Sequence, residues 1–148
     1  MTKTVKNIFV EGPIPPKKVA QSIASHQSKH EIGAHQLFLG QIRKDEVDNS
    51  IVEAIEYSAQ TEMANQVAHE IREEAFAKFD VTCLHIYHSL GTIKVGEIGF
   101  MVFTSSPHRA ACRDACSFIV EQFKKHVPIY GKTLYENGKH GWKENTES

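Results

Sequence analysis

The sequence has few cysteines, no long apolar run and no excess of charge of one sign. Its cysteines, Cys83, Cys112 and Cys116, are an odd number in apolar surroundings, which argues against the disulfide framework of a secreted protein. No stretch approaches the roughly 20 apolar residues that a membrane-spanning helix needs, and no basic and then apolar leader is recognisable. We therefore expect a cytoplasmic protein without a membrane segment.

The net charge of -1 gives no general attraction to nucleic acid, and the chain lacks the interleaved aromatic and basic residues of RNA-binding surfaces. The charges are nevertheless unevenly distributed. Residues 31–80 carry 11 acidic and 4 basic side chains, whereas residues 107–143 carry 7 basic and 3 acidic ones. This separation is typical of a protein with a basic pocket and acidic outer faces, so we expect an anionic ligand.

At 148 residues and 41% hydrophobic content, residues 1–148 are expected to form a single domain with its own core. The expected strands cover residues 4–10, 33–42, 51–57, 81–88 and 97–104, with a short extended segment at 129–135. The expected helices cover residues 17–26, 61–79 and 107–125. Strands 33–42 and 51–57 should form a hairpin around a polar loop. This order predicts an α+β fold with a largely antiparallel sheet.

Two segments have clear apolar faces. Thr61 is expected to cap the helix over 61–79, whose inner stripe consists of Ala64, Val67, Ala68, Ile71, Ala75 and Phe79. In strand 97–104 apolar residues occupy both faces, with Ile98, Phe100 and Val102 on one side and Met101 and Phe103 on the other. Apolar character on both faces predicts a central strand.

The start of the third helix is a candidate anion site. Ser106 is expected to cap this helix, and Pro107 to occupy its first position, where a missing N–H costs nothing. His108 and Arg109 then fall in the first turn. Free amides, the positive end of the helix dipole and a guanidinium together favour a phosphate or a carboxylate.

Arg109 and Lys124 are fifteen residues apart on the same predicted helix. At a rise of about 1.5 Å per residue they lie roughly 22 Å from each other, so one chain cannot place both on one small ligand. Either they serve two sites, or a symmetric dimer brings the start of one helix near the end of its partner's. We prefer the dimer.

The other basic candidates leave alternatives open. Lys124 and Lys132 flank Pro128, and a turn there would bring the two amines together, lower the pKa of one and make it a base or nucleophile. Alternatively, both are solvated lysines near a helix C-terminus. Arg43 follows a predicted strand, where it either binds a ligand or is simply solvated.

No metal site is expected. Cys112 and Cys116 are four residues apart on a predicted helix, but buried packing is the favoured interpretation. The other histidines lack close metal-ligand spacing and are expected to be structural or exposed: His35, His69, His85, His88, His126 and His140. The residues alone thus leave two classes open, an enzyme acting on an anionic substrate and a non-enzymatic module that binds phosphorylated ligands or RNA.

Short motifs run in order from Gly33 to Trp142. They are Gly33-Ala34, Phe38-x-Gly40-x-Ile42-Arg43, Ile55-Glu56-Tyr57, Met63-Ala64, His88-x-x-Gly91, Val95-Gly96-Glu97, Ser106-Pro107-His108-Arg109, Ala115-Cys116 and Val127-Pro128-Ile129. In this order the motifs resemble the large, catalytic subunit of molybdopterin synthase, the MoaE family.

The resemblance implies an α/β-hammerhead type fold and a central homodimer. A small ubiquitin-like, MoaD-like carrier subunit would dock at each end, giving a heterotetramer, and insert its C-terminal Gly-Gly thiocarboxylate. The implied substrate is cyclic pyranopterin monophosphate, and the implied reaction transfers two sulfurs to it, forming the dithiolene of molybdopterin. Neither a cofactor nor a metal is implied.

The resemblance also implies residue roles. Lys124 matches the lysine that meets the carrier's C-terminus, and Lys132 is the candidate second lysine. The implied substrate-binding residues are Gln41, Ile42, Arg43, His108, Arg109, Gly131 and Thr133, with His108 and Arg109 supplied across the dimer. The sequence departs from the family in two places. Gly131 stands where the second lysine usually follows two apolar residues, and Ser89 stands where arginine is common.

Overall fold

The computed structural model of the protein describes residues 4–143. In chain order the elements are β1 (Phe9–Glu11), α1 (Pro16–His26), β2 (Ala34–Gln41), β3 (Glu46–Val47), β4 (Ser50–Ala59), α2 (Thr61–Lys78), β5 (Cys83–Lys94), β6 (Ile98–Ser106), α3 (Arg109–His126), β7 (Ile129–Tyr135) and β8 (His140–Lys143). Within this range no helix combines the length and the apolar character needed to cross a bilayer. The tail 145–148, to which the resemblance assigns no role, lies outside the described residues.

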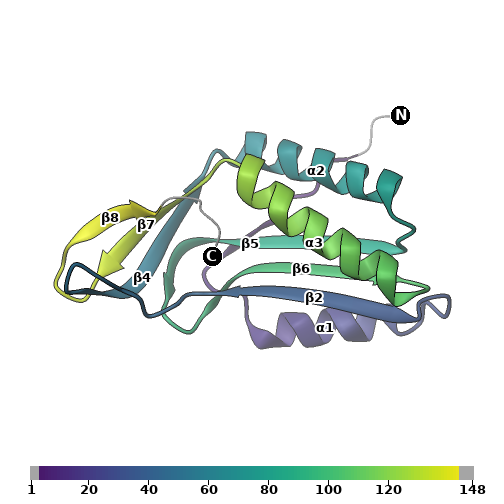
Figure 1. Ribbon diagram of the computed structural model, residues 1–148, viewed down its shortest axis with the longest axis horizontal. Coiled ribbons are helices and arrows are strands. Elements are labelled where there is room, and N and C mark those ends of the chain that lie inside the picture. Colours follow the sequence, from purple (N-terminus) through teal and green to yellow (C-terminus); the bar gives the residue numbers. More distant parts are fainter. Residues whose placement is uncertain (1–3, 144–148) are drawn as a thin grey trace.

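The strands form an open sheet with the order β2-β6-β5-β4-β7-β8, while β1 pairs with β5 and β3 with β4. Only the β1–β5 pair is parallel among the described strand pairs. Figure 1 shows α2 and α3 on one face of the sheet, α1 on the opposite face, and β4, β7 and β8 extending beyond the helices at one end. The predicted α+β fold with a largely antiparallel sheet is confirmed.

Strand β5 connects the two parts of the sheet. Its first half, Cys83–His88, pairs with β6, and its second half pairs with β4 from Gly91 onward. Gly91 has a φ of +91°, a left-handed conformation that glycine adopts without steric cost, at the point where the partner changes. The predicted strand 81–88 is therefore too short, because this glycine turns the chain without ending the strand.

The two faces of the central strands bury different cores. Leu84, Ile86 and Val102 pack with the buried stripes of α2 and α3, as predicted. On the other face, Met101 and Phe103 pack with Ile14 and with residues of α1. Apolar side chains on both faces make these strands central.

Ile98 was expected on the same face as Phe100, and this prediction is wrong. Ile98 packs with Met101 and Phe103 instead. Phe100 pairs with Gly40 and Ile98 with the next residue of β2, so β6 carries one extra residue between them. Such a bulge reverses the alternation of side chains, which moves Ile98 to the α1 face.

The predicted hairpin between strands 33–42 and 51–57 is also wrong. β2 pairs along its length with β6, and β4 lies between β5 and β7. The polar loop between β2 and β4 contains the short strand β3, whose Glu46 and Val47 pair with Ile51 and Ser50 at the start of β4. Asp48 and Asn49, with φ values of 51° and 64°, close this small hairpin in the manner of a type I′ turn.

The predicted strand 4–10 is reduced to β1, Phe9–Glu11. The side chain of Asn65 explains the later start, because its Oδ1 accepts the hydrogen bond of the Ile8 amide at 2.9 Å. The predicted helix 17–26 is confirmed, with Pro16 as its first residue.

Neither Thr61 nor Ser106 occupies the predicted N-cap position. Thr61 is the first residue of α2 and makes no cap bond, since Gln60 holds the N-cap position. Ser106 ends β6, and α3 starts at Arg109 after His108. The Ser106 backbone belongs to the sheet, but its Oγ still accepts a hydrogen bond from the Cys112 amide in the first turn of α3, at 3.0 Å.

Gly33 fixes the approach of β2 to the start of α3. Its amide donates to the Ser106 carbonyl at 3.0 Å, and a Cβ at this position would collide with the backbone carbonyl oxygen of Pro107. Side chains are therefore excluded from position 33 by the backbone that leads into α3.

We predict that Gly33→Ala lowers the free energy of unfolding by about 1–3 kcal/mol, as overpacking does, in urea denaturation. Gly141→Ala is the matched control, because a Cβ there meets nothing within 4 Å; its effect should stay within about 0.5 kcal/mol. Equal stability of the two variants would contradict the proposed collision.

Candidate active site

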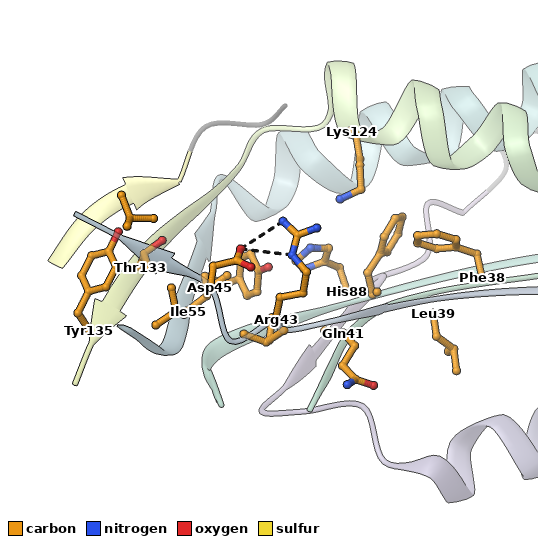
Figure 2. A pocket seen from close by; sticks show the side chains of 17 residues that line it. Phe38, Leu39, Gln41, Arg43, Asp45, Ile55, His88, Lys124, Thr133 and Tyr135 are labelled. Atoms are coloured by element: carbon orange, nitrogen blue, oxygen red, sulfur yellow. Dashed lines mark hydrogen bonds and ion pairs between the residues drawn. The ribbon is translucent and has the colours of Figure 1, made fainter. Parts of the chain in front are cut away.

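A cavity of about 340 Å³ opens where β2 ends, between β4, β7 and the last turns of α3. A volume of this size is typical of small-molecule sites. Five of the predicted site residues line it: Gln41, Ile42, Arg43, Lys124 and Thr133. Figure 2 shows the Lys124 amine on α3 directed toward the space that Arg43 borders, with Thr133 on β7 beyond Asp45 and the Gln41 amide directed to the other side of β2. Residues far apart in sequence thus form one basic cavity.

Aromatic rings form the inner wall of the cavity. Phe100 and Phe38 both line it, with ring centroids 5.7 Å apart in an edge-to-face arrangement. The Lys124 Nζ lies 5.7 Å from the Phe100 ring centroid, a cation–π distance, and the Lys124 side chain is half-buried. A cation over an aromatic wall and out of bulk water acts more strongly on a bound anion than a solvated lysine does.

His88 also lines the cavity and is only 7% exposed. Its Nδ1 lies 2.8 Å from the Ser89 carbonyl oxygen, which can only accept, so Nδ1 donates and Nε2 is the acceptor in the neutral ring. The ring stacks on Phe123 at 5.8 Å and meets Tyr57 edge-on at 4.8 Å. The cavity therefore includes a histidine of fixed orientation.

Tyr57 completes this part of the wall. Burial raises the pKa of its phenol, so the O–H remains protonated at neutral pH and is available as a donor. Sequence reasoning missed both His88 and Tyr57 as site residues. The alternation of side chains along β5 could have identified His88. It follows Leu84 and Ile86 on the same buried face, where a polar residue is unusual.

Arg43 lies at the mouth of the cavity beside Asp45. Its Nη2 and Nε lie 3.2 Å and 3.3 Å from the Asp45 Oδ2. Both side chains are about half exposed or more, at 63% and 47%, so the pair contributes little to stability. An incoming anionic ligand can therefore replace Asp45 at small cost.

Thr133 and Lys132 are neighbours on β7, and their side chains point to opposite faces of the strand. Thr133 and Tyr135 line the cavity, whereas Lys132 alternates to the other face of the strand. β7 pairs with β4 in regular register from Ile129 through Leu134, so Gly131 is an ordinary strand residue and not a bulge. It is Gly131, not Lys132, that shares the face of Thr133.

His108 and Arg109 lie away from the cavity. Both are exposed, and α3 runs without interruption from Arg109 through Lys124. The roughly 22 Å expected along a continuous helix therefore applies to the folded chain. One chain thus brings Lys124 to the cavity and leaves His108 and Arg109 at the opposite end of α3.

The family described as MoaE protein matches residues 10–126. The chain belongs to the MoaE family. The molybdopterin synthase catalytic subunit of Drosophila grimshawi is 41% identical over 117 residues, which cover 78% of this chain and 32% of that protein. The chain thus spans about a third of the length of that relative.

Two solved structures have the same fold. Molybdopterin synthase from Staphylococcus aureus is 26% identical with a TM-score of 0.81, covering 95% of this chain and 98% of the other. A complex of subunits 1 and 2 of molybdopterin-converting factor from Helicobacter pylori is 20% identical with a TM-score of 0.77, covering 92% and 88%. The predicted family and fold are confirmed, and the enzyme interpretation is favoured over the RNA-binding module.

Proposed function

We propose that this chain is the catalytic subunit of a molybdopterin synthase and acts as a sulfurtransferase. It transfers sulfur from the C-terminal thiocarboxylate of a small ubiquitin-like carrier subunit to cyclic pyranopterin monophosphate, and two transfers give the dithiolene. The observation that carries the proposal is the cavity in which Lys124 and Arg43 meet an aromatic wall. The three free cysteines fit a cytoplasmic location, where thiols stay reduced.

The substrate has two parts that suit two kinds of surface. The flat pterin suits the wall formed by Phe38 and Phe100, whereas the Gln41 amide points to the other side of β2. Arg43 supplies a guanidinium at the mouth after releasing Asp45. This arrangement favours a planar, anionic molecule over an extended nucleic acid.

Lys124 has the central role in the proposed chemistry. When the thiocarboxylate sulfur attacks a carbon of the pterin side chain, a C–S bond forms and negative charge shifts from the sulfur to an oxygen of the substrate. An ammonium already held over Phe100 stabilises that charge without reorganisation, which is how preorganised electrostatics lower a barrier. Water then cleaves the acyl C–S bond, which releases the carrier as a carboxylate and leaves the sulfur on the substrate. Lys132 stays the candidate second lysine, but its side chain lies on the other face of β7, so the proposed chemistry assigns it no step in this cavity.

Assembly completes the proposed site. His108 and Arg109 are exposed at the far end of α3, so a second copy must bring them to the substrate phosphate. The Helicobacter pylori complex of two subunits supports a small-subunit partner for this chain. We propose a homodimer with one carrier bound at each end.

Lys124→Ala should reduce dithiolene formation by about 10²-fold or more, the loss typical of removing one preorganised group. The assay incubates the chain with thiocarboxylated carrier and pyranopterin substrate and follows the dithiolene product. Lys125→Ala is the matched control, because Lys125 is the exposed neighbour on the same helix turn.

Fold and carrier binding should survive in Lys124→Ala, as checked by circular dichroism and by co-purification with the carrier. Activity near that of the unmodified protein would exclude the role of Lys124. The same assay on Lys132→Ala measures the contribution of the second lysine. Absence of product from the unmodified protein would return the binding-module alternative to first place.

Arg109→Ala should raise the apparent KM for the pyranopterin by about 10- to 150-fold, since a hydrogen bond to a charged group contributes about 1.5–3 kcal/mol. The effect on kcat should be small, because phosphate is bound equally in ground and transition states. Arg113→Ala, an exposed arginine one turn further along α3, should leave KM unchanged. An unaltered KM in Arg109→Ala would remove Arg109 from the site.

Co-expressed Lys124→Ala and Arg109→Ala subunits should recover about a quarter of normal activity at low substrate, because half of randomly assorted dimers contain one complete site of two. Each variant alone provides the baseline. Activity is recovered only if one site combines residues of two chains. An activity of the mixture equal to the average of the two variants measured alone would contradict the shared site.

A further inference from the structure

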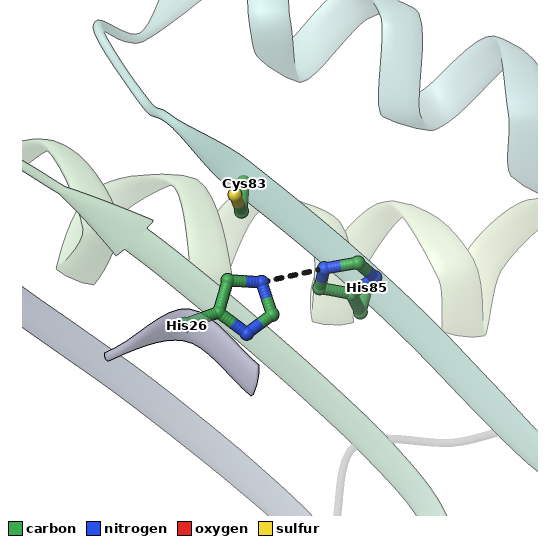
Figure 3. Close-up of side chains that lie close together, drawn as sticks. All are labelled: His26, Cys83 and His85. Carbon is green, nitrogen blue, oxygen red and sulfur yellow. Dashed lines mark hydrogen bonds between the residues drawn. The ribbon is translucent and has the colours of Figure 1, made fainter. Parts of the chain in front are cut away.

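Three metal-ligating side chains meet on the α1 face of the sheet. His26 is the last residue of α1, and Cys83 and His85 project from the same side of β5 because they are two residues apart. One ligand atom of each lies within 4.8 Å of the others. Figure 3 shows the two imidazoles facing each other beside the Cys83 sulfur.

We propose that His26, Cys83 and His85 bind Zn²⁺ with two nitrogens and one sulfur, with water as the fourth ligand. The site lies on the opposite face of the sheet from α3, so it is separate from the cavity that contains Lys124. It holds the metal in a structural role, linking the end of α1 to the central strand.

The spacing of the two histidine nitrogens is close to that around a tetrahedral ion, and the Cys83 sulfur lies within 4.8 Å of a ring nitrogen of each histidine. The Nε2 atoms of His26 and His85 lie 3.0 Å apart. Two nitrogens bound to zinc at about 2.0–2.1 Å with tetrahedral angles are about 3.3–3.4 Å apart, so the rings need to separate by only a few tenths of an ångström. Imidazole and thiolate without carboxylate favour zinc over magnesium or calcium.

The His26 ring is oriented for metal binding by its own helix. Its Nδ1 lies 2.6 Å from the Ser22 carbonyl oxygen, and because a carbonyl only accepts, Nδ1 carries the proton. The lone pair is therefore on Nε2, which faces His85. Histidines that bind zinc usually donate their other ring N–H to a carbonyl or carboxylate, which fixes the tautomer as it does here.

The other two ligands each give up a hydrogen bond when the metal binds. The His85 Nε2 lies 3.0 Å from the His26 Nε2, and because the His26 proton is on Nδ1, His85 donates this hydrogen bond. Zinc takes the place of that proton, which moves to Nδ1 of His85 or leaves to solvent. Lys29 donates a hydrogen bond to the Cys83 sulfur at 3.0 Å. Lys29 is exposed, so its ammonium can move into solvent when the dication binds.

The site is tested on the tag-free chain after chelator treatment, by titration with Zn²⁺ and with Co²⁺ as a spectroscopic probe. We expect one ion per chain, a rise in Tm with zinc, and a thiolate-to-cobalt charge-transfer band. X-ray absorption of the zinc-loaded protein should give one sulfur at about 2.3 Å and two imidazole nitrogens at about 2.0–2.1 Å. This measurement needs no variant.

Cys83→Ser and His85→Gln should each weaken zinc binding by at least about tenfold, since even loss of an outer-shell partner costs that much. Cys112→Ser and His140→Ala are the controls, one buried thiol and one exposed imidazole outside the cluster, and both should bind like the unmodified protein. Circular dichroism of the metal-free variants verifies their fold.

Three results would overturn the proposal: no saturable binding by the unmodified protein, an absorption spectrum without a sulfur neighbour, or equal zinc affinity in folded Cys83→Ser. Sulfur-transfer activity of the metal-free protein is expected to match that of the loaded protein. The zinc test therefore does not depend on the proposed function.

Discussion

The change of partner within β5 is the constraint on which the rest of this structure depends. One continuous strand pairs first with β6 under the helices and then with β4 beyond them. The helical layer and the outlying strands β4 and β7 consequently meet at an angle, as Figure 1 shows, and side chains leave an opening at the junction. A flat sheet running straight on would have no such opening next to the end of α3.

The cavity combines two properties that normally oppose each other. Its wall is apolar and aromatic, yet it holds the ammonium of Lys124, and partial burial of a cation costs free energy. The contact with Phe100 offsets part of that cost, and a bound anion would offset more. Arg43 is placed differently, at the rim, where its exposed ion pair with Asp45 keeps it solvated until a ligand arrives.

Local patterns in the sequence were sufficient for the helices and most of the strands. The stripes of α2 and α3 and both faces of β6 follow from periodicity, and Lys124 and Arg43 were found through family motifs and lie in one cavity. Strand pairing was not accessible in the same way, because β2 pairs with β6 across more than fifty residues of intervening chain. The bulge that moves Ile98, the burial of His88 and the cluster around His26 also depend on such distant neighbours.

The uninterrupted helix α3 fixes both the distance and the relative direction of the residues at its two ends. Lys124 near one end contacts the cavity wall, while Arg109 at the other end is oriented by the junction of Gly33, Ser106 and Pro107. One inserted or deleted residue between them would rotate one end relative to the other by about 100° and change the spacing by about 1.5 Å. Variation in length is thus tolerable in the loops of this protein, whereas the stretch between these two cations must keep its residue count.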